Sequence, residues 1–499
     1  MVTSCPGALS TSRRQTAGIA LSAGVFAVFC LWGGAARSAP PQVQIPTEEQ
    51  LQTGDEYTTA GGNFLSGLAR TNFLLGNMGG LRPFLAQYGI SLALQETSEV
   101  LGNISGGFHT GFDYDGLTQM VLQLDTNRAF GWYGGTFNAS ALQIHGRSLS
   151  ADNLGTLQTA SGIEADRATR LWELWYDQKF LEEDRADIKV GQQSLDQEFI
   201  VSQNALLFVN TMFGWPMLPS ADLPGGGPAY PLSALGVRGR WRPWDPVTFL
   251  VGVFNGSPVK NGVGGDPQLA NASGTSFPLN GGALLIAEMQ YSYPSLGSML
   301  YADQTEPLAR VFKLGFWYDT ERFSDLRFDN TGLSLANPLS TGIPQQHRGD
   351  YSIYAVADQL IWVDPQEADR TISLFGRAMG TPETNRNLVD ISVNFGMTFH
   401  EPFLHRDDDT FGVGLGFAQV SGQASALDQD TAFYTGAFNP ARSSETFIEV
   451  TYQYSVAPWL QLQPDFQYVF NPGAGIANAS GTARIKDEAV LGVRTNILF

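Results

Sequence analysis

The C-terminal residues of the chain alternate between apolar and polar side chains. One parity holds Leu491, Val493 and Ile497, whereas the other holds Arg494 and Asn496. Because an extended strand turns successive side chains to opposite faces, this stretch predicts a strand with one apolar and one mostly polar face. A strand of this kind fits a wall that separates lipid from water.

The same period of two recurs along most of the chain. We predict about sixteen strands, starting near residues 90, 119, 135, 169, 187, 235, 247, 283, 308, 350, 371, 389, 411, 445, 460 and 490. The connections alternate between short and long, and the long ones lie near 99–117, 145–168, 193–234, 255–282, 320–349, 420–443 and 471–487. Two connections depart from the alternation: the turn near 294–307 is long and the loop near 380–387 is short.

These patterns predict an all-β fold, a transmembrane antiparallel barrel of about sixteen strands over residues 89–499. An even strand number with short turns at one end and long loops at the other is typical of bacterial outer-membrane barrels. A barrel of this size encloses water, whereas an eight-stranded barrel is filled by its side chains. The alternative is a soluble β-propeller or sandwich, which gives no reason for the alternation of long and short connections.

The first 38 residues have the pattern of a secretory signal peptide. Arg13 and Arg14 precede an apolar stretch that ends at Trp32, and a small-x-small cleavage site ends at Ser38. An uncleaved membrane anchor is the alternative. Both cysteines of the chain lie in this segment, so we expect the mature protein to cross an oxidising compartment without forming disulfides.

Residues 39–88 are expected to form a short periplasmic segment, with a helix over residues 81–88 that Gly89 ends. Beyond the predicted signal, no stretch reaches the ~20 apolar residues of a membrane helix. The chain is nevertheless 43% hydrophobic, which leaves a closed barrel as the way to span a membrane. The formal charge of −19 at pH 7 argues against nucleic acid as a partner.

Several runs between residues 74 and 258 resemble the OprB-type carbohydrate-selective porins. They are Leu74–Arg82, Thr97–Asn103, Ser140–Arg147, Leu171–Tyr176, Phe213–Pro216, Leu223–Pro231 and Gly252–Gly256. The terminal Phe499 likewise resembles the last residue of a closing barrel strand in Gram-negative outer membranes. The second half of the chain is assigned to the barrel mainly by its strand pattern.

This resemblance implies an outer-membrane porin of a Gram-negative bacterium that lets sugars diffuse passively, either mono- and small oligosaccharides or polyols. A general porin for small hydrophilic solutes is the alternative. The expected partners are sugars and the lipid and lipopolysaccharide of the outer membrane. The expected oligomeric state is a monomer or a homotrimer, without a cofactor.

Charged and amide side chains on the lumen wall can hydrogen-bond to sugar hydroxyls, and aromatic rings can stack on sugar rings. We expect the connection 193–234 to fold inward as a constriction. Arg238 and Arg240 should face the lumen, because an arginine facing lipid near the midplane costs roughly 2–4 kcal/mol. The other predicted pore-lining or sugar-binding residues are Gln143, His145, Arg147, Glu173, Trp175, Asp177, Lys189, Asp196, Glu198, Lys313, Trp317 and Asp319. A charge-balanced polar wall without selectivity is the alternative.

The histidines do not indicate an enzyme. The five histidines are scattered along the chain without the spacing of metal ligands. The glycines of Gly225–Gly227 are flanked by prolines and do not open a helix, so they do not form a phosphate-binding loop. We therefore predict no catalytic residues and no metal site.

Overall fold

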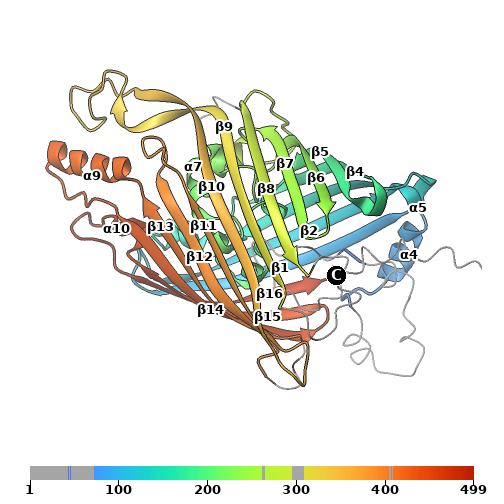
Figure 1. The fold of residues 1–499 in the computed structure, drawn as a ribbon. Coiled ribbons are helices and arrows are strands. Elements are labelled where there is room, and N and C mark those ends of the chain that lie inside the picture. The colour runs from blue at the N-terminus through green and yellow to red at the C-terminus, as the bar shows by residue number, and fades with distance from the viewer. Residues whose placement is uncertain are drawn as a thin grey trace, which may run out of the picture. The chain divides into compact units, whose positions relative to one another are not determined.

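The computed structural model describes residues 43, 45–46, 72–260, 265–294, 308–403, 406 and 408–499. The predicted signal peptide, most of the predicted N-terminal segment and most of the turn at 294–307 lie outside these ranges. Within them, sixteen strands form one closed antiparallel barrel, in which neighbours in the chain pair and β1 closes on β16 (Figure 1). The predicted fold class is therefore confirmed.

Fourteen of the sixteen strands start within two residues of the predicted positions, whereas β2 and β10 start about eight and six residues earlier than predicted. The strands are β1 Ile90–Ser105, β2 Gly111–Asp125, β3 Gly135–Gly146, β4 Ala168–Phe180, β5 Ala186–Gln193, β6 Ala234–Trp244, β7 Val247–Asn255, β8 Ala283–Tyr293, β9 Arg310–Asp329, β10 Pro344–Val363, β11 Thr371–Gly380, β12 Val389–His400, β13 Thr410–Val420, β14 Ser444–Ala457, β15 Leu460–Phe470 and β16 Glu488–Leu498.

Two hairpins extend further into the predicted loops than expected. β1 reaches Ser105, and β9 reaches Asp329, so the connections predicted at 99–117 and 320–349 are shorter in the structure. Charged residues and glycines interrupt the alternation in these strand ends, although the backbone ladder continues. The prediction of a short connection near 380–387 is confirmed, since β12 follows β11 after eight residues.

Helices lie before β1 and in the connections between strands. They are η1 Met78–Gly80, α4 Leu81–Ala86, α5 Thr126–Phe130, α6 Leu149–Asp152, η2 Glu182–Asp184, η3 Leu195–Gln197, η4 Asn204–Leu207, η5 Thr211–Phe213, α7 Met217–Asp222, η6 Pro224–Gly226, α8 Pro267–Ala270, α9 Gly422–Thr435 and α10 Pro472–Gly475. Among the described helices, none has the length and apolarity needed to cross a membrane. The predicted helix before Gly89 is α4, and Gly89 has a φ of +73° that suits glycine.

The two faces of the barrel wall differ as the parity of the strands predicts. Large apolar side chains point outward and are exposed, for example Leu314 at 59% and Ile353 at 63%. Arg494 of the last strand points inward, where it pairs with Glu99 and both side chains are fully buried. An apolar outer band with a polar interior is the pattern of a barrel that faces lipid.

The described part of the N-terminal segment packs against the barrel at the seam between β1 and β16. The backbone N–H of Leu74 donates to the carbonyl of Leu498 at 2.8 Å. Arg82 is 3% exposed, and its guanidinium donates to the carbonyl of Phe499 and lies 4.2 Å from the centre of the Phe73 ring. Burial lowers the pKa of Arg82 to about 10, which leaves this side chain charged at neutral pH.

Replacing Arg82 with alanine is expected to destabilise the folded barrel by roughly 2–4 kcal/mol, because carbonyls at the seam lose a charged donor. The measurement is the temperature at which the purified barrel loses its compact migration on an SDS gel. Arg322→Ala, at an exposed position of β9, serves as the control. Equal temperatures for the two variants would contradict a stabilising role for Arg82.

Candidate functional site

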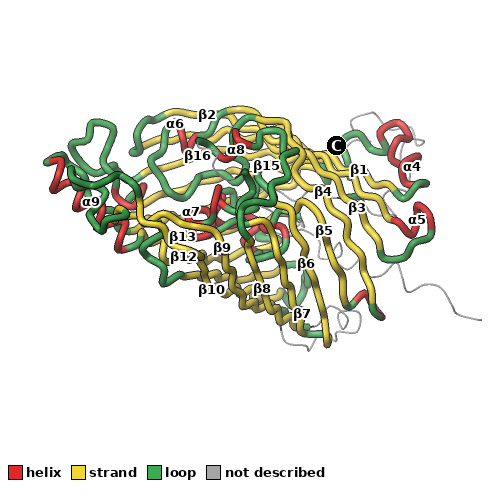
Figure 2. The backbone as a smooth tube through the Cα atoms, turned by 90° about the horizontal axis from the view of Figure 1, so that it is seen from above, coloured by secondary structure: helices red, strands yellow, loops and turns green. Residues whose placement is uncertain are grey.

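The connection between β5 and β6, residues 194–233, folds into the barrel and is called the inner loop here. Seen from above, α7 and the neighbouring turns lie within the ring of strands (Figure 2). Phe208 and Phe213 are fully buried against Phe375 of the wall, with ring centres 5.5 and 5.8 Å away. A Cβ atom at Gly414 of β13 would lie 2.5 Å from the Phe213 ring, so this glycine makes room for the loop.

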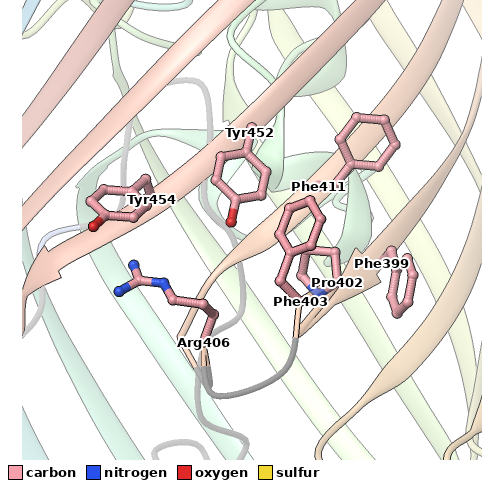
Figure 3. Close-up of a pocket in the computed structure, with 7 residues that line it drawn as sticks. All are labelled: Phe399, Pro402, Phe403, Arg406, Phe411, Tyr452 and Tyr454. Carbon is pink, nitrogen blue, oxygen red and sulfur yellow. The ribbon is translucent and has the colours of Figure 1, made fainter.

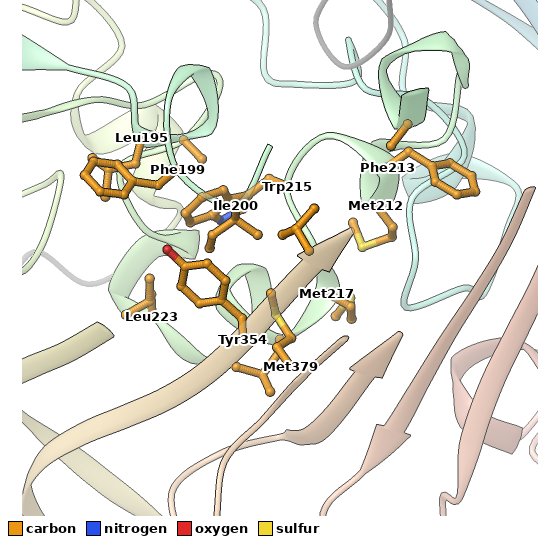
Figure 4. Packing of buried hydrophobic residues seen from close by; sticks show 14 of the residues in the cluster. Leu195, Phe199, Ile200, Met212, Phe213, Trp215, Met217, Leu223, Tyr354 and Met379 are labelled. Carbon is orange, nitrogen blue, oxygen red and sulfur yellow. The ribbon is translucent and has the colours of Figure 1, made fainter. Parts of the chain in front are cut away.

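Further apolar side chains join the inner loop to the wall on the side of β10 and β11. Tyr354 of β10 and Met379 of β11 project from the wall toward Ile200 and Trp215 of the loop (Figure 4). All four side chains are buried. The inner loop is therefore packed as a core against this part of the wall, rather than lying free in the lumen.

Arg377 of β11 is the main polar anchor of the inner loop. Its side chain is 2% exposed and donates to the backbone carbonyls of Ile200, Met212, Phe213 and Gly214 at distances of 2.5 to 3.0 Å. A guanidinium can satisfy several carbonyls because it carries five N–H donors in a rigid plane. One buried residue thus fixes both ends of the turn 200–214.

Carboxylates of the wall accept hydrogen bonds from the N–H groups of the same loop. Glu288 of β8 accepts from Ile200 at 2.9 Å, and Glu449 of β14 accepts from Val209 at 2.6 Å. Asp358 of β10 accepts from the Ser202 hydroxyl at 2.6 Å. Many acidic residues of the lumen wall therefore hold backbone in place and are not free to contact a solute.

The connection 147–167 also folds against the wall. Glu445 of β14 accepts from the N–H groups of Leu157 and Gln158, each at 2.8 Å, and Glu488 accepts from that of Gly155 at 2.8 Å. The N–H of Thr211 donates to the carbonyl of Thr159 at 3.2 Å, which joins this connection to the inner loop. Two long connections thus meet inside the barrel on the side of β14–β16.

Asp222 of α7 holds the far end of the inner loop. Its carboxylate accepts from the N–H groups of Leu388 and Val389 at 2.8 and 3.2 Å. Burial and the nearby carboxylates of Asp350 and Asp390 raise the pKa of Asp222 well above its usual range. An acid whose pKa is raised by folding costs stability as the pH rises from its unfolded pKa through its folded pKa.

Asp222→Asn is therefore expected to unfold at a higher temperature than the wild type at pH 8, and the difference should shrink toward pH 4. The amide oxygen can still accept the two N–H groups. Heat-dependent migration on SDS gels at the two pH values measures this, and Asp152→Asn at an exposed position of α6 is the control. A pH-independent difference would contradict the assigned titration.

Opposed charges line the wall of β4, β5 and β6 on the other side of the inner loop. This charged ladder consists of Asp177, Asp187, Lys189, Arg238 and Arg240, together with Glu198 of the inner loop. Arg238 pairs with Asp187, and its Nη2 atom lies 3.1 Å from Glu198 and 3.9 Å from Asp177. Lys189 pairs with Glu198, and Arg240 pairs with Asp187.

The ladder offers both donors and acceptors to the lumen. The Arg240 side chain is 32% exposed and that of Glu198 is 21% exposed, whereas Arg238 and Asp187 are almost fully buried. Lys189 Nζ lies 4.2 Å from the centre of the Trp175 ring, a cation–π contact. Charged groups that are already paired and partly exposed can exchange hydrogen bonds with a neutral solute without leaving a bare charge.

The other predicted site residues on the inner side mainly support the inner loop. Glu173 accepts from the N–H of Ser194 at 3.0 Å, and Asp196 accepts from that of Tyr230 at 3.1 Å. Lys313 donates to the carbonyl of Val201 at 2.7 Å. Trp317 and Asp319 are buried at 1% and 0% exposure, so they are covered rather than presented to the lumen.

The structure places Gln143 and His145 on the outer face of β3, which corrects their predicted position in the pore. The inward parity of this strand holds Leu142 and Ile144, both buried against residues of the folded-in connection such as Ile163. Apolar residues can face inward here because loops cover the wall. Arg147 is exposed just beyond the end of β3.

A β-bulge explains a second departure from strict alternation. Ala139 pairs with Leu174, whereas Ala141 pairs with Leu171, so β4 holds an extra residue at this point. Trp172 consequently points inward and is 5% exposed. Strict alternation with the inward Glu173 predicts the outward face of β4 for this side chain.

Two important residues did not appear among the sequence-derived candidates. Asp187 is the shared partner of Arg238 and Arg240, and its parity, two positions before Lys189, could have identified it. Arg377 is a single arginine on the inward parity between Phe375 and Met379. Its role depends on the folded loop, which strand periodicity does not describe.

An aromatic hollow of about 710 Å³ lies on the turn side of β12, β13 and β14. Figure 3 shows its lining residues, Phe399, Pro402, Phe403, Arg406, Phe411, Tyr452 and Tyr454. Phe399 and Phe411 share the outward parity of their strands, so the hollow faces away from the lumen. Its position is that of the aromatic girdle at a membrane boundary. Among the residues described, no cluster of three or more histidine, cysteine or acidic side chains could hold a metal ion.

Comparison with known proteins agrees with this architecture. Residues 109–499 match the family described as "Carbohydrate-selective porin, OprB family". Porin B of Pseudomonas aeruginosa is 23% identical over 455 residues, which cover 86% of this chain and 92% of that protein. The putative porin QuiX of Acinetobacter baylyi is 21% identical and covers 86% of this chain and 93% of its own length.

The fold is also similar to a solved structure. The high-pH structure of Pseudomonas putida OprB has a TM-score of 0.73 and 22% identity, covering 86% of this chain and 98% of that chain. The protein is therefore a non-enzymatic channel of the outer membrane, and it belongs to the OprB family of carbohydrate-selective porins.

Proposed function

We propose that this porin favours the passive diffusion of neutral sugars, from monosaccharides and polyols to small oligosaccharides, over other small hydrophilic solutes. The charged ladder is the observation that carries this proposal. Its three cations, Lys189, Arg238 and Arg240, oppose three carboxylates, Asp177, Asp187 and Glu198. A balanced row of this kind attracts neither anions nor cations strongly, while it offers many hydrogen bonds to hydroxyl groups.

The position of Trp175 supports the same proposal. Its ring belongs to the inward parity of β4 and lies beside Lys189. An aromatic face can stack on the apolar side of a sugar ring while the charged neighbours hydrogen-bond to its hydroxyls. A conducting pore must bind its solute weakly enough to release it, and groups already satisfied by one another meet that condition.

Block of the ion current by glucose in planar bilayers tests this proposal. We expect glucose to reduce the single-channel current of the wild type, and Arg240→Gln to weaken this block because the exposed, charged guanidinium of the ladder is lost. Arg242→Gln is the matched control, since Arg242 contacts the carbonyl of Glu183 in the turn and not the ladder. Equal weakening by the two variants would contradict the role of Arg240. Absence of block in the wild type would favour a general porin.

A further inference from the structure

Two hollows lie on the lipid-facing side of the barrel, over neighbouring strands. The larger one is the aromatic hollow described above, which β12, β13 and β14 form at their short-turn ends. The smaller one, called the wall groove here, has a volume of about 380 Å³ and lies over β9 to β12. Larger outward side chains would fill such depressions, so their absence leaves open space against the lipid.

Small outward residues form the floor of the wall groove. Ala357 of β10 pairs with Gly376 of β11, and Phe312 of β9 and Phe395 of β12 flank them in the same row. A Cβ atom at Gly376 would meet only the Phe395 ring, at 3.9 Å, and the backbone there does not have a positive φ. Neither crowding nor backbone conformation therefore requires a glycine at this position.

The wall groove and the aromatic hollow lie on one path along β12. Phe395 borders the groove, Phe399 lines the hollow, and both have the outward parity of this strand. Four residues of strand span about 13 Å. The row between them holds Leu374, Met397 and Val413, which pair with one another in that order. The surface from the hollow to the groove is therefore apolar throughout.

The guanidinium of Arg406 lies at the rim of the aromatic hollow, 4.1 Å from the centre of the Tyr454 ring (Figure 3). Its Nε and Nη2 atoms donate to the carboxylate of Asp409 at 2.8 and 2.7 Å, and Nη2 also donates to the carbonyl of Ser455 at 2.9 Å. Among the described residues, none accepts a hydrogen bond from Nη1. The two N–H groups of Nη1 can therefore donate to a phosphate oxygen.

The acidic residues near Arg406 favour a head group that carries both charges. Asp409 is fully buried and is already satisfied by Arg406 and by the hydroxyl of Tyr452. Asp408, in the same turn, is exposed. A phosphate next to an ammonium matches a guanidinium with an exposed carboxylate beside it, whereas a purely anionic head group is repelled by that carboxylate.

We propose that the aromatic hollow and the wall groove together bind one phospholipid of the periplasmic leaflet, a zwitterionic one with a primary ammonium such as phosphatidylethanolamine. Its phosphate accepts from Nη1 of Arg406, its ammonium lies toward Asp408, and one acyl chain follows β12 into the wall groove. The short turns lie on the periplasmic side, and aromatic rings at this boundary sit at the level of the head groups. The site is separate from the lumen and does not depend on the sugar preference.

Native mass spectrometry of the purified mature barrel tests this proposal. The protein is delipidated in detergent and titrated with phosphatidylethanolamine. We expect the wild type to retain one molecule and Arg406→Gln to bind it about tenfold more weakly, because one charge-assisted hydrogen bond is lost. Arg185→Gln removes an arginine that is paired with acids in another short turn and should not weaken binding. No bound lipid in the wild type, or equal weakening by the two variants, would overturn the proposal.

A second variant covers the case in which Arg406→Gln does not fold, since that change leaves the buried Asp409 without its cation. Gly376→Leu fills the wall groove from the lipid side, and Gly239→Leu, at an outward glycine of β6 with open space around it, is the matched control. We expect only Gly376→Leu to weaken binding, with both variants folded by heat-dependent migration. Equal affinities of the two leucine variants would refute the path of the acyl chain. Equally tight binding of phosphatidylglycerol, which lacks the ammonium, would refute the choice of head group.

Discussion

Replacing Arg377 with alanine is expected to release the inner loop from the wall and to widen the pore. The variant loses the charged donor that holds the carbonyls of Ile200, Met212, Phe213 and Gly214. Several charge-assisted hydrogen bonds disappear together, so we expect the docked state of the loop to lose roughly 3–5 kcal/mol. The aromatic contacts of Phe208 and Phe213 remain, but they no longer have a polar anchor beside them.

Single-channel recording in planar bilayers measures this effect. We expect a larger and noisier conductance for Arg377→Ala, and swelling of liposomes by oligosaccharides that the wild type excludes. Arg348→Ala, at an exposed position of β10, is the control for loss of a positive charge. An unchanged conductance, together with an intact barrel on SDS gels, would mean that the inner loop does not set the width of the path.

Neutralising Glu198 should have the second large effect, which is a change in the relative permeability of the channel to cations and anions. Glu198 lies between Lys189 and Arg238 and is the one member of the ladder that the inner loop contributes. Its loss leaves the ladder with an excess positive charge. A unit charge about 8 Å from the path, at an effective dielectric near 40, changes the energy of an ion by about 1 kcal/mol, or about fivefold in permeability.

Reversal potentials under a salt gradient measure this change. For Glu198→Gln we expect the permeability ratio of cations to anions to fall about fivefold. Glu183→Gln removes the same charge from an exposed turn beside Arg185 and should leave the ratio nearly unchanged. A similar shift in both variants would indicate a general field of the acidic protein rather than a local effect of the ladder.

The fold was predictable from the sequence because its dominant signal is local. In a strand such as β12, Val393 and Phe395 face lipid while Ser392 and Asn394 face inward, and this alternation can be read from neighbouring residues alone. The inward arginines of β6 followed from the same parity, since Val237 and Trp241 occupy the outward side. The short helix before Gly89 followed from local signals of helix termination.

The contacts inside the barrel were not predictable in the same way. The alternation of side chains predicts lumen residues only if the inward-facing side chains contact water. In the structure, however, the connections that fold into the barrel bury Leu142, Ile144 and Trp317. The alternation therefore placed His145 in the lumen, although this side chain lies on the outward face of β3, 3.6 Å from Glu96. The bulge at Trp172 and the partners of Arg377 depend on pairing between residues far apart in the sequence, which periodicity does not encode.

The most direct test of the central claim is the rate at which proteoliposomes swell in isosmolar solutions of different solutes. The proteoliposomes would contain the purified mature protein. Their swelling rates would be compared for glucose, a small oligosaccharide and amino acids of similar size to glucose. We expect glucose to enter faster than the amino acids, and Arg240→Gln to reduce this preference more than Arg242→Gln. Equal rates for sugars and amino acids in the wild type would contradict sugar selectivity and leave a general porin.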